Sequence, residues 1–228
     1  KEAGDYLSIV RLSDEDLSQS ETIPNVLSRV YADGLLVNYN YDVPHEVQEN
    51  IVHYRVPAIW INSVHMSKCV FPDDADAANR LVDHFLSAGK RRIAYVAFPG
   101  KHYSVTRRRE GYLQAMAAAG LPPLCIDLKL GQPVFLKKDA LPEVILAYAT
   151  KDLQYVCDEL VLRGVLPGRD IQVGTIADVP FLFLGQKHPT VVLPQYKIGV
   201  TAVHELMKCI ADASYCPSPF VLRGKLQS

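Results

Sequence analysis

The sequence predicts an α/β protein in which a parallel sheet carries helices on both faces. Two observations support this class. Short apolar runs of strand length alternate along the chain with segments whose apolar residues recur at helical spacing. The 228 residues, of which 49% are hydrophobic and 21% charged, supply enough apolar side chains for one large domain or two intertwined lobes. Alternating strands and helices are typical of a parallel sheet, because its crossovers are usually helices.

Strands and helices are predicted in strict alternation over the first part of the chain. In order, they are a strand over residues 6–12, a helix around 23–30, a strand over 35–37, a helix from 44 to 54 and a strand over 57–62. Asp33 and Gly34 supply the turn before the second strand, and Pro44 suits the first turn of the second helix. Trp60 lies inside the third strand, so we expect it in the core.

The alternation continues to the C-terminus. Helices are predicted over residues 74–88, 105–119, 153–163 and 198–210, and strands over 93–98, 144–148, 171–176 and 220–222. Asp73 or Asp74 caps the first of these helices, and glycines end the first three. Residues 128–141 depart from the pattern, because Gly131 and Pro133 interrupt the stretch where a helix is expected. That region is either an irregular loop or a place where residues are missing.

Charge and cysteine usage exclude several classes. The formal net charge is −1 at pH 7, whereas a DNA-binding domain usually carries a basic excess, and the two basic runs at 90–92 and 107–109 are interpreted as helix ends or solvated faces. No apolar run reaches the roughly 18 residues of a membrane span, so no membrane partner is expected. The five cysteines are scattered without a CxxC pair, which predicts reduced thiols in a cytoplasmic protein.

The sequence has no common catalytic, cofactor or metal motif. It contains no GxGxxG after a strand, no GxxxxGK[ST] loop, no GxSxG elbow and no HExxH. The histidines and cysteines lack the spacing of metal ligands, and the aspartates at 73, 74 and 76 are interpreted as a helix N-cap cluster rather than a calcium loop. We therefore predict no enzyme, catalytic residue, cofactor or metal. An α/β enzyme whose site is assembled from distant residues is kept as an alternative.

Several segments, taken in order, resemble the effector-binding core of the LacI/GalR transcription regulators. They are ADGLLV at 32–37, VPAIWIN at 56–62, VDHFLSAGKRRIAYV at 82–96, RREGYLQAM at 108–116, GRDIQV at 168–173 and PTVV at 189–192. The third and fourth are similar to the family patterns HLxxLGHRRIAxI and RRxGYxxAL. Each segment alone is weak, but the ordered set is specific and covers nearly the whole chain.

The resemblance implies a periplasmic binding protein type I-like fold of two Rossmann-like lobes, each with a parallel sheet flanked by helices. The first lobe would comprise residues 1–73 and 193–212, and the second residues 74–192 and 213–228. A ligand would bind between the lobes, at the carboxyl ends of the strands. Nothing in the chain resembles the family's helix-turn-helix and hinge helix, or the first strand of its core, so we expect a longer protein.

The resemblance also implies a function. A sugar or similar metabolite would bind between the lobes and control operator binding by a helix-turn-helix head that this chain lacks. Such regulators are commonly homodimers, because palindromic operators have two-fold symmetry. The alternative is a periplasmic sugar-binding protein of a transporter, which shares the fold.

Arg108 is the strongest candidate for contact with the effector. It lies three residues before Gly111 and matches the family's effector-contacting arginine. Its guanidinium presents donors that suit paired hydroxyls or a carboxylate. The alternative interpretation is a solvated arginine at a helix start. We expect Arg108→Ala to abolish effector binding and to leave the fold intact.

Five further residues are assigned to the effector site by their positions. They are Asn62, Phe71, Ser104, Tyr148 and Asp178. Asn62 follows a strand and offers an amide to a hydroxyl-rich ligand, and Ser104 lies one turn before the arginine. Asp178 matches a family aspartate, and the two aromatic rings would form apolar or stacking walls. The alternatives are a turn for Asn62, a helix cap for Ser104 and core positions for the rings.

Four positions are less polar than the resemblance implies. They are Ala149, Thr150, Ala177 and Leu193. An unpaired buried polar group costs roughly 1–3 kcal/mol, so the polarity of a pocket tends to match its ligand. A ligand less polar than a typical hexose, or a pocket that has lost ligand binding, is therefore kept as an alternative.

Overall fold

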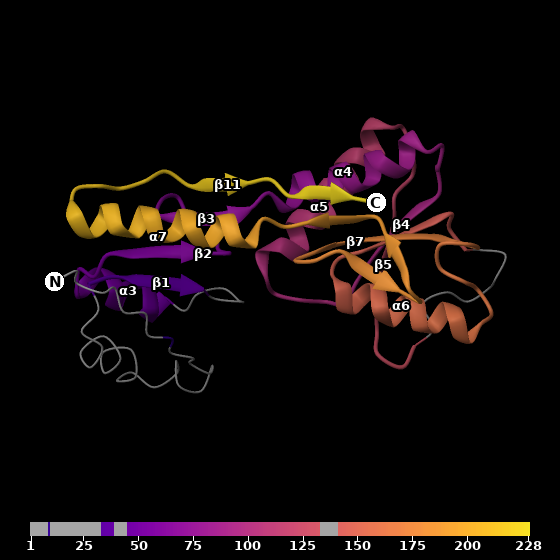
Figure 1. The fold of residues 1–228 in the computed structure, drawn as a ribbon, viewed down its shortest axis with the longest axis horizontal. Coiled ribbons are helices and arrows are strands. Elements are labelled where there is room, and N and C mark those ends of the chain that lie inside the picture. The colour runs from indigo at the N-terminus through magenta and orange to yellow at the C-terminus, as the bar shows by residue number, and fades with distance from the viewer. Residues whose placement is uncertain (1–8, 10–32, 39–44, 133–140) are drawn as a thin grey trace.

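The computed structural model describes residues 9, 33–38, 45–132 and 141–228. The strand predicted over 6–12 and the helix predicted around 23–30 lie outside the described residues, except for Ile9. The described chain forms two lobes, each with its own sheet, and the two sheets lie side by side along the long axis of the molecule (Figure 1). The α/β prediction is confirmed.

In the part that the structure describes, the first lobe is a parallel sheet with one helix on each face. Its strand order is β1-β2-β3-β11, and the strands are β1 (Leu35–Asn38), β2 (Ala58–Ile61), β3 (Cys69–Pro72) and β11 (Phe220–Leu222). Side chains alternate between the two faces, as they must in a strand. Trp60 packs towards α3 (His45–His53), whereas Ile59 packs towards α7 (Gln195–Ala211). Trp60 is buried, as predicted.

The second lobe is a mixed sheet of six strands. Its order is β12-β10-β7-β6-β4-β5, with β12 (Lys225–Gln227), β10 (Thr190–Val192), β7 (Gln172–Ala177), β6 (Val144–Ala147), β4 (Ile93–Ala97) and β5 (Leu124–Asp127). Only the β10–β12 pair is antiparallel among these neighbours. Residues of α4 (Asp74–Ser87) and α5 (Tyr103–Ala118) share one core cluster with the sheet, and α6 (Thr150–Leu162) packs on the other face.

Within the described residues, the chain passes between the lobes three times. The passages follow β3, β10 and β11. The prediction placed residues 213–228 entirely in the second lobe, but β11 pairs with β3 of the first sheet while β12 pairs with β10 of the second. The last passage therefore lies within this tail, near Gly224, where an added Cβ would lie 2.8 Å from a Val191 side-chain atom.

Several strands were not predicted. They are β3, β5, β10, β12 and the hairpin of β8 (Phe181–Phe183) with β9 (Gln186–His188). Each has three or four residues, which is too short to show a period. Of the irregular region predicted at 128–141, the structure describes residues 128–132 and 141, and there β5 leads into a turn near Gly131.

Other expectations concern features that the described residues lack. No described helix is both long and apolar enough to cross a membrane. No three histidine, cysteine or acidic side chains of the described segments are grouped so that they could hold a metal ion. All five cysteines are free thiols, and Cys157 and Cys209 are buried.

Candidate effector site

A cavity of about 270 Å³ lies between the lobes, where the parallel strands of both sheets end. Its lining comes from both lobes and consists of Asn62, Pro72, Asp74, His102, Tyr103, Ser104, Arg108, Tyr148, Asp178, Leu193 and Gln195. Asn62 directly follows β2, Tyr148 follows β6 and Asp178 follows β7. In open α/β folds this edge is where ligands bind, because loops leave the strands there and surround a crevice.

The structure brings five of the six predicted site residues to this cavity. They are Asn62, Ser104, Arg108, Tyr148 and Asp178. Phe71 does not line it. This side chain packs in the first core, and its ring meets the edge of Tyr103 with centroids 6.1 Å apart. Phe71 therefore contacts Tyr103, which lines the cavity, but does not line the cavity itself.

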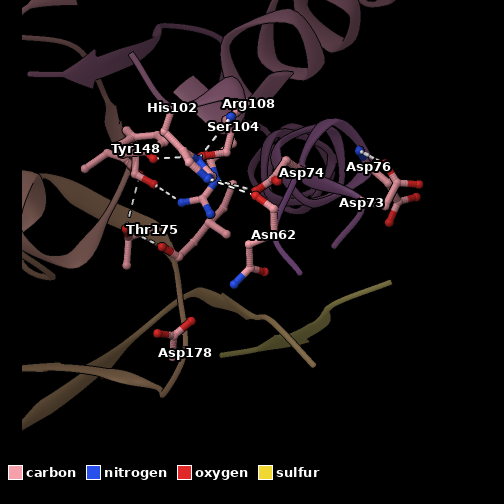
Figure 2. A network of polar contacts seen from close by, with 12 residues as sticks. Asn62, Asp73, Asp74, Asp76, His102, Ser104, Arg108, Tyr148, Thr175 and Asp178 are labelled. Atoms are coloured by element: carbon pink, nitrogen blue, oxygen red, sulfur yellow. Dashed lines mark hydrogen bonds and ion pairs between the residues drawn. The ribbon is translucent and has the colours of Figure 1, made fainter. Parts of the chain in front are cut away.

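Arg108 is held by two short contacts. Its Nε donates to Oδ1 of Asp74 at 2.6 Å, its Nη1 donates to the Tyr148 carbonyl at 2.6 Å, and its Cζ lies 4.6 Å from the centre of the Tyr148 ring (Figure 2). Both partners of the ion pair are buried. Burial alone would lower the pKa of Arg108, but the Asp74 carboxylate outweighs it and raises the pKa. Arg108 therefore keeps its positive charge within the protein.

Close helix packing brings this pair together. Gly111 on α5 faces the backbone of Ala75 on α4, and a Cβ at Gly111 would lie 2.1 Å from the Ala75 oxygen. Only glycine allows this approach. The helix start is fixed in turn by Asp73, whose carboxylate accepts from the Asp76 amide at 3.1 Å. The RRxGY pattern thus contains both Arg108 and Gly111, and Gly111 lets α5 pack closely enough on α4 for Arg108 to reach Asp74.

A chain of hydrogen bonds runs beside Arg108. Oη of Tyr148 lies 2.8 Å from Oγ of Ser104, which lies 2.6 Å from Nδ1 of His102. On the other side of the imidazole, Nε2 lies 3.1 Å from the Asn62 carbonyl oxygen, so the chain reaches the first lobe. His102 also caps α5, because its ring accepts from the Ser104 amide. Figure 2 shows these residues converging with Asp74 on one place.

The rest of the lining offers further acceptors and donors. Asn62 adopts a left-handed backbone with φ 53°, and its Nδ2 donates to Oδ1 of Asn38 at 3.4 Å. On the far side of the cavity, Nε2 of Gln195 donates to the Asp178 carboxylate at 2.8 Å. Oδ1 of Asn62 and Oδ2 of Asp74 are buried with no hydrogen-bond partner among the described residues. Such acceptors are satisfied when a ligand hydroxyl or a water donates to them.

Sequence reasoning missed four lining residues that matter for this chemistry. They are Asp74, His102, Tyr103 and Gln195. Asp74 was considered only as a helix cap, because the short strand β3 before it was not predicted. If β3 had been predicted, Asp74 would have been expected near the carboxyl end of a strand, as Asn62 was. Burial and the neighbouring Asp74 carboxylate raise the pKa of Tyr103, so its hydroxyl stays protonated and able to donate.

The arrangement is suited to binding. A serine beside a histidine also occurs in hydrolases, but here Ser104 is buried, and its hydroxyl lies between His102 and Tyr148. On its other side the imidazole lies against the Asn62 backbone carbonyl. The cavity therefore combines hydrogen-bond donors and acceptors around a buried serine hydroxyl.

Comparison with known proteins agrees with this geometry. Residues 82–226 match the family of periplasmic binding protein-like domains, and residues 10–135 match the periplasmic binding proteins and sugar binding domain of the LacI family. The comparison with curated proteins found no match.

Several solved structures similar to this chain are described as regulators. A LacI-family regulatory protein from Chloroflexus aggregans has a TM-score of 0.78 and 19% identity, over 94% of this chain and 82% of that one. The regulator CelR, in complex with cellobiose, has a TM-score of 0.74 and 18% identity, over 92% and 68%. A periplasmic binding protein/LacI transcriptional regulator from Alkaliphilus metalliredigens QYMF, complexed with D-xylulofuranose, has a TM-score of 0.74 and 16% identity, over 91% and 80%.

Fold, cavity position and two overlapping family matches agree. This chain belongs to the periplasmic binding protein-like family that includes the sugar-binding domain of the LacI regulators, and it has the fold of a LacI-type effector-binding domain.

Proposed function

We propose that the cavity between the lobes binds a small, uncharged, hydroxyl-rich molecule, and that this binding controls a LacI-type transcription regulator. The observation that carries the proposal is the buried pair of Arg108 and Asp74 at the meeting point of the two lobes. It presents a guanidinium and a carboxylate side by side, which matches a ligand whose hydroxyls both donate and accept.

The charges of the lining favour an uncharged ligand over an anion. Among the lining residues that the structure describes, Arg108 is the one lysine or arginine, and it is paired with Asp74. Asp178 adds a second carboxylate on the opposite side. A phosphate or carboxylate on the ligand would have to enter a site whose formal charge is already negative. Like charges repel strongly where water is excluded, so such a group would be unfavourable there.

Polar groups from two helix starts compensate for the less polar strand ends. Leu193 lines the cavity and is buried, and Ala177 is buried at the end of β7. His102, Tyr103 and Asp74 supply polar atoms from the starts of α5 and α4 instead. This supports a carbohydrate-like ligand that is held chiefly from the second lobe.

Other parts of the proposal concern the whole regulator. We propose that operator DNA is bound by a helix-turn-helix head outside this chain, that the regulator is a homodimer, and that it acts in the cytoplasm. We also propose that residues 1–73 and 193–212 form the first lobe with β11, and residues 74–192 the second lobe with β12. The similar solved structures are regulators, which favours this function over a transporter's binding protein.

A thermal-shift screen followed by calorimetry tests the ligand class. The panel contains neutral mono- and disaccharides, including cellobiose and D-xylulose, together with sugar phosphates and sugar acids. A ligand that binds only the folded state raises the melting temperature, and we expect this for a neutral sugar. A shift produced only by phosphates or sugar acids would overturn the proposal.

Arg108→Lys links such a shift to the site. Lysine keeps a positive charge opposite Asp74 but lacks the planar fork of donors, so we expect affinity for the identified sugar to fall roughly tenfold or more. Arg107→Lys on the exposed face of the same helix is the control, and it should bind as the unmodified chain does.

A further inference from the structure

The imidazole of His102 joins the two lobes. His102 precedes α5 of the second lobe, and Asn62 follows β2 of the first lobe. The distance of 3.1 Å between Nε2 and the Asn62 carbonyl oxygen is that of a hydrogen bond. A second contact between the lobes, from Gln195 on α7 to Asp178 after β7, lies across the cavity.

The fixed ends of the hydrogen-bond chain determine the direction of each bond. A backbone carbonyl can only accept, so Nε2 of His102 carries the proton. The Ser104 amide can only donate, and it donates to Nδ1 at 3.4 Å, so Nδ1 is the bare nitrogen. Ser104 Oγ therefore donates to Nδ1, and Tyr148 Oη donates to Ser104. A single tautomer of His102, with the proton on Nε2, is therefore compatible with every bond of this series.

We infer that His102 is a latch that holds the two lobes in the arrangement seen here, with its Nε2–H tautomer fixed by Ser104 and Tyr148. The chain of bonds ends at Tyr148, whose carbonyl and ring also contact Arg108. The latch is thereby coupled to the proposed effector arginine. Its role in effector binding rests on the proposed function, whereas its role in holding the lobes does not.

The latch predicts different results for two substitutions. His102→Asn keeps a short side-chain acceptor that caps α5, as asparagine does well at this position, but it is too short to reach Asn62. His102→Gln keeps a longer side chain whose amide can donate to the Asn62 carbonyl. We expect the Asn variant to lose the contact between the lobes and the Gln variant to retain it in part.

Two measurements on the ligand-free chain test the latch. In ¹⁵N-histidine NMR spectra, the signals that disappear in His102→Asn belong to His102, and we expect them to show a single Nε2–H tautomer. In small-angle scattering, His102→Asn should have a larger radius of gyration than the unmodified chain, and His102→Gln a value between the two. Tautomer averaging, or identical scattering of all three proteins, would overturn the inference.

The same variants separate the latch from the effector proposal. If a neutral sugar from the screen binds, its affinity should fall roughly 2- to 10-fold in His102→Asn, as expected for one hydrogen bond. If no sugar binds, the NMR and scattering results still decide the latch. Should His102→Asn not fold, the tautomer of the unmodified chain, assigned with His102→Gln, decides it.

Discussion

Arg108 has a structural role in addition to its proposed role in ligand binding. The sequence suggested that Arg108→Ala would leave the fold intact. In the structure, however, its removal would leave the Asp74 carboxylate buried without its cation. An uncompensated buried charge is strongly destabilising, whereas a surface pair contributes little. The sequence alone could not show this structural role of Arg108, because its partner Asp74 lies 34 positions away in the chain.

We predict that Arg108→Ala lowers the free energy of unfolding by about 3–5 kcal/mol. The control is Arg107→Ala, which removes an exposed arginine that pairs with Glu110 across one helical turn, and it should change stability by less than about 0.5 kcal/mol. Urea denaturation of the three proteins measures both values. Equal stability of the two variants would show that the Asp74 carboxylate finds another partner.

His188 gives a prediction for pH. Burial lowers the pKa of His188, although a hydrogen bond with the Phe183 backbone opposes the shift. The unfolded chain therefore binds this proton at a higher pH than the folded chain does. Stability should be constant above pH of about 6.5 and fall as the pH decreases below it, by at most about 1.4 kcal/mol per pH unit for one group.

His188→Gln should reduce this acid-side slope. Burial also lowers the pKa of His65, so the variant keeps part of the dependence and a double variant with His65→Gln should be flatter still. Urea midpoints between pH 5 and 8 provide the measurement. A slope that is the same in the single and double variants and in the unmodified chain would exclude both histidines as its source.

At the scale of elements, the sequence predicted the helices of the second lobe and its strands β4, β6 and β7, but it missed β5, β10 and β12. These three strands and three helices have long apolar runs or clear helical spacing, and their predicted bounds agree with the structure to within a few residues. Strands such as β5 and β12 lie at the edges of the sheet and are partly exposed. Whether they form depends on pairing with the neighbouring strand. Local sequence periodicity does not reveal such pairing.

Helix packing gives a prediction at the same scale. Gly111→Ala would place a methyl group against the Ala75 backbone, so α4 and α5 would have to separate. We expect a loss of about 1–3 kcal/mol in unfolding free energy, together with weaker sugar binding because Asp74 and Arg108 move apart. Urea denaturation and calorimetry measure the two effects.

Gly199→Ala is the matched control for this substitution. Gly199 lies within α7, and nothing stands within 4 Å of an added Cβ. Alanine has the higher helix propensity, so this variant should gain up to about 1 kcal/mol. If both variants lose stability equally, close packing of α4 on α5 is not the cause.

At the scale of the whole molecule, the two lobes have separate cores. Trp60, the only tryptophan, lies in a cluster of the first lobe, whereas both helical faces of the second sheet have clusters of their own. Three passages of the chain and the contacts around the cavity join the lobes. Among the described residues, these connections are few compared with the contacts inside each lobe.

We therefore predict that urea unfolding is not a single two-state transition. The midpoint from Trp60 fluorescence, which reports the first lobe, should differ from the midpoint from far-UV circular dichroism, which reports both. A bound sugar contacts both lobes and should bring the midpoints together. Coincident midpoints in the ligand-free chain would mean that the lobes unfold as one unit.

The sequence by itself determined the alternation of strands and helices, the resemblance to the LacI regulators and most of the residues at the carboxyl ends of strands. These features depend on the local spacing of apolar residues, on turns and on short motifs, and each of these involves residues close together in the sequence. Only the tertiary structure decided that Asp74 pairs with Arg108 and that His102 reaches Asn62, 40 positions away. Such contacts depend on how two helices pack and how two sheets face each other, which no local pattern specifies.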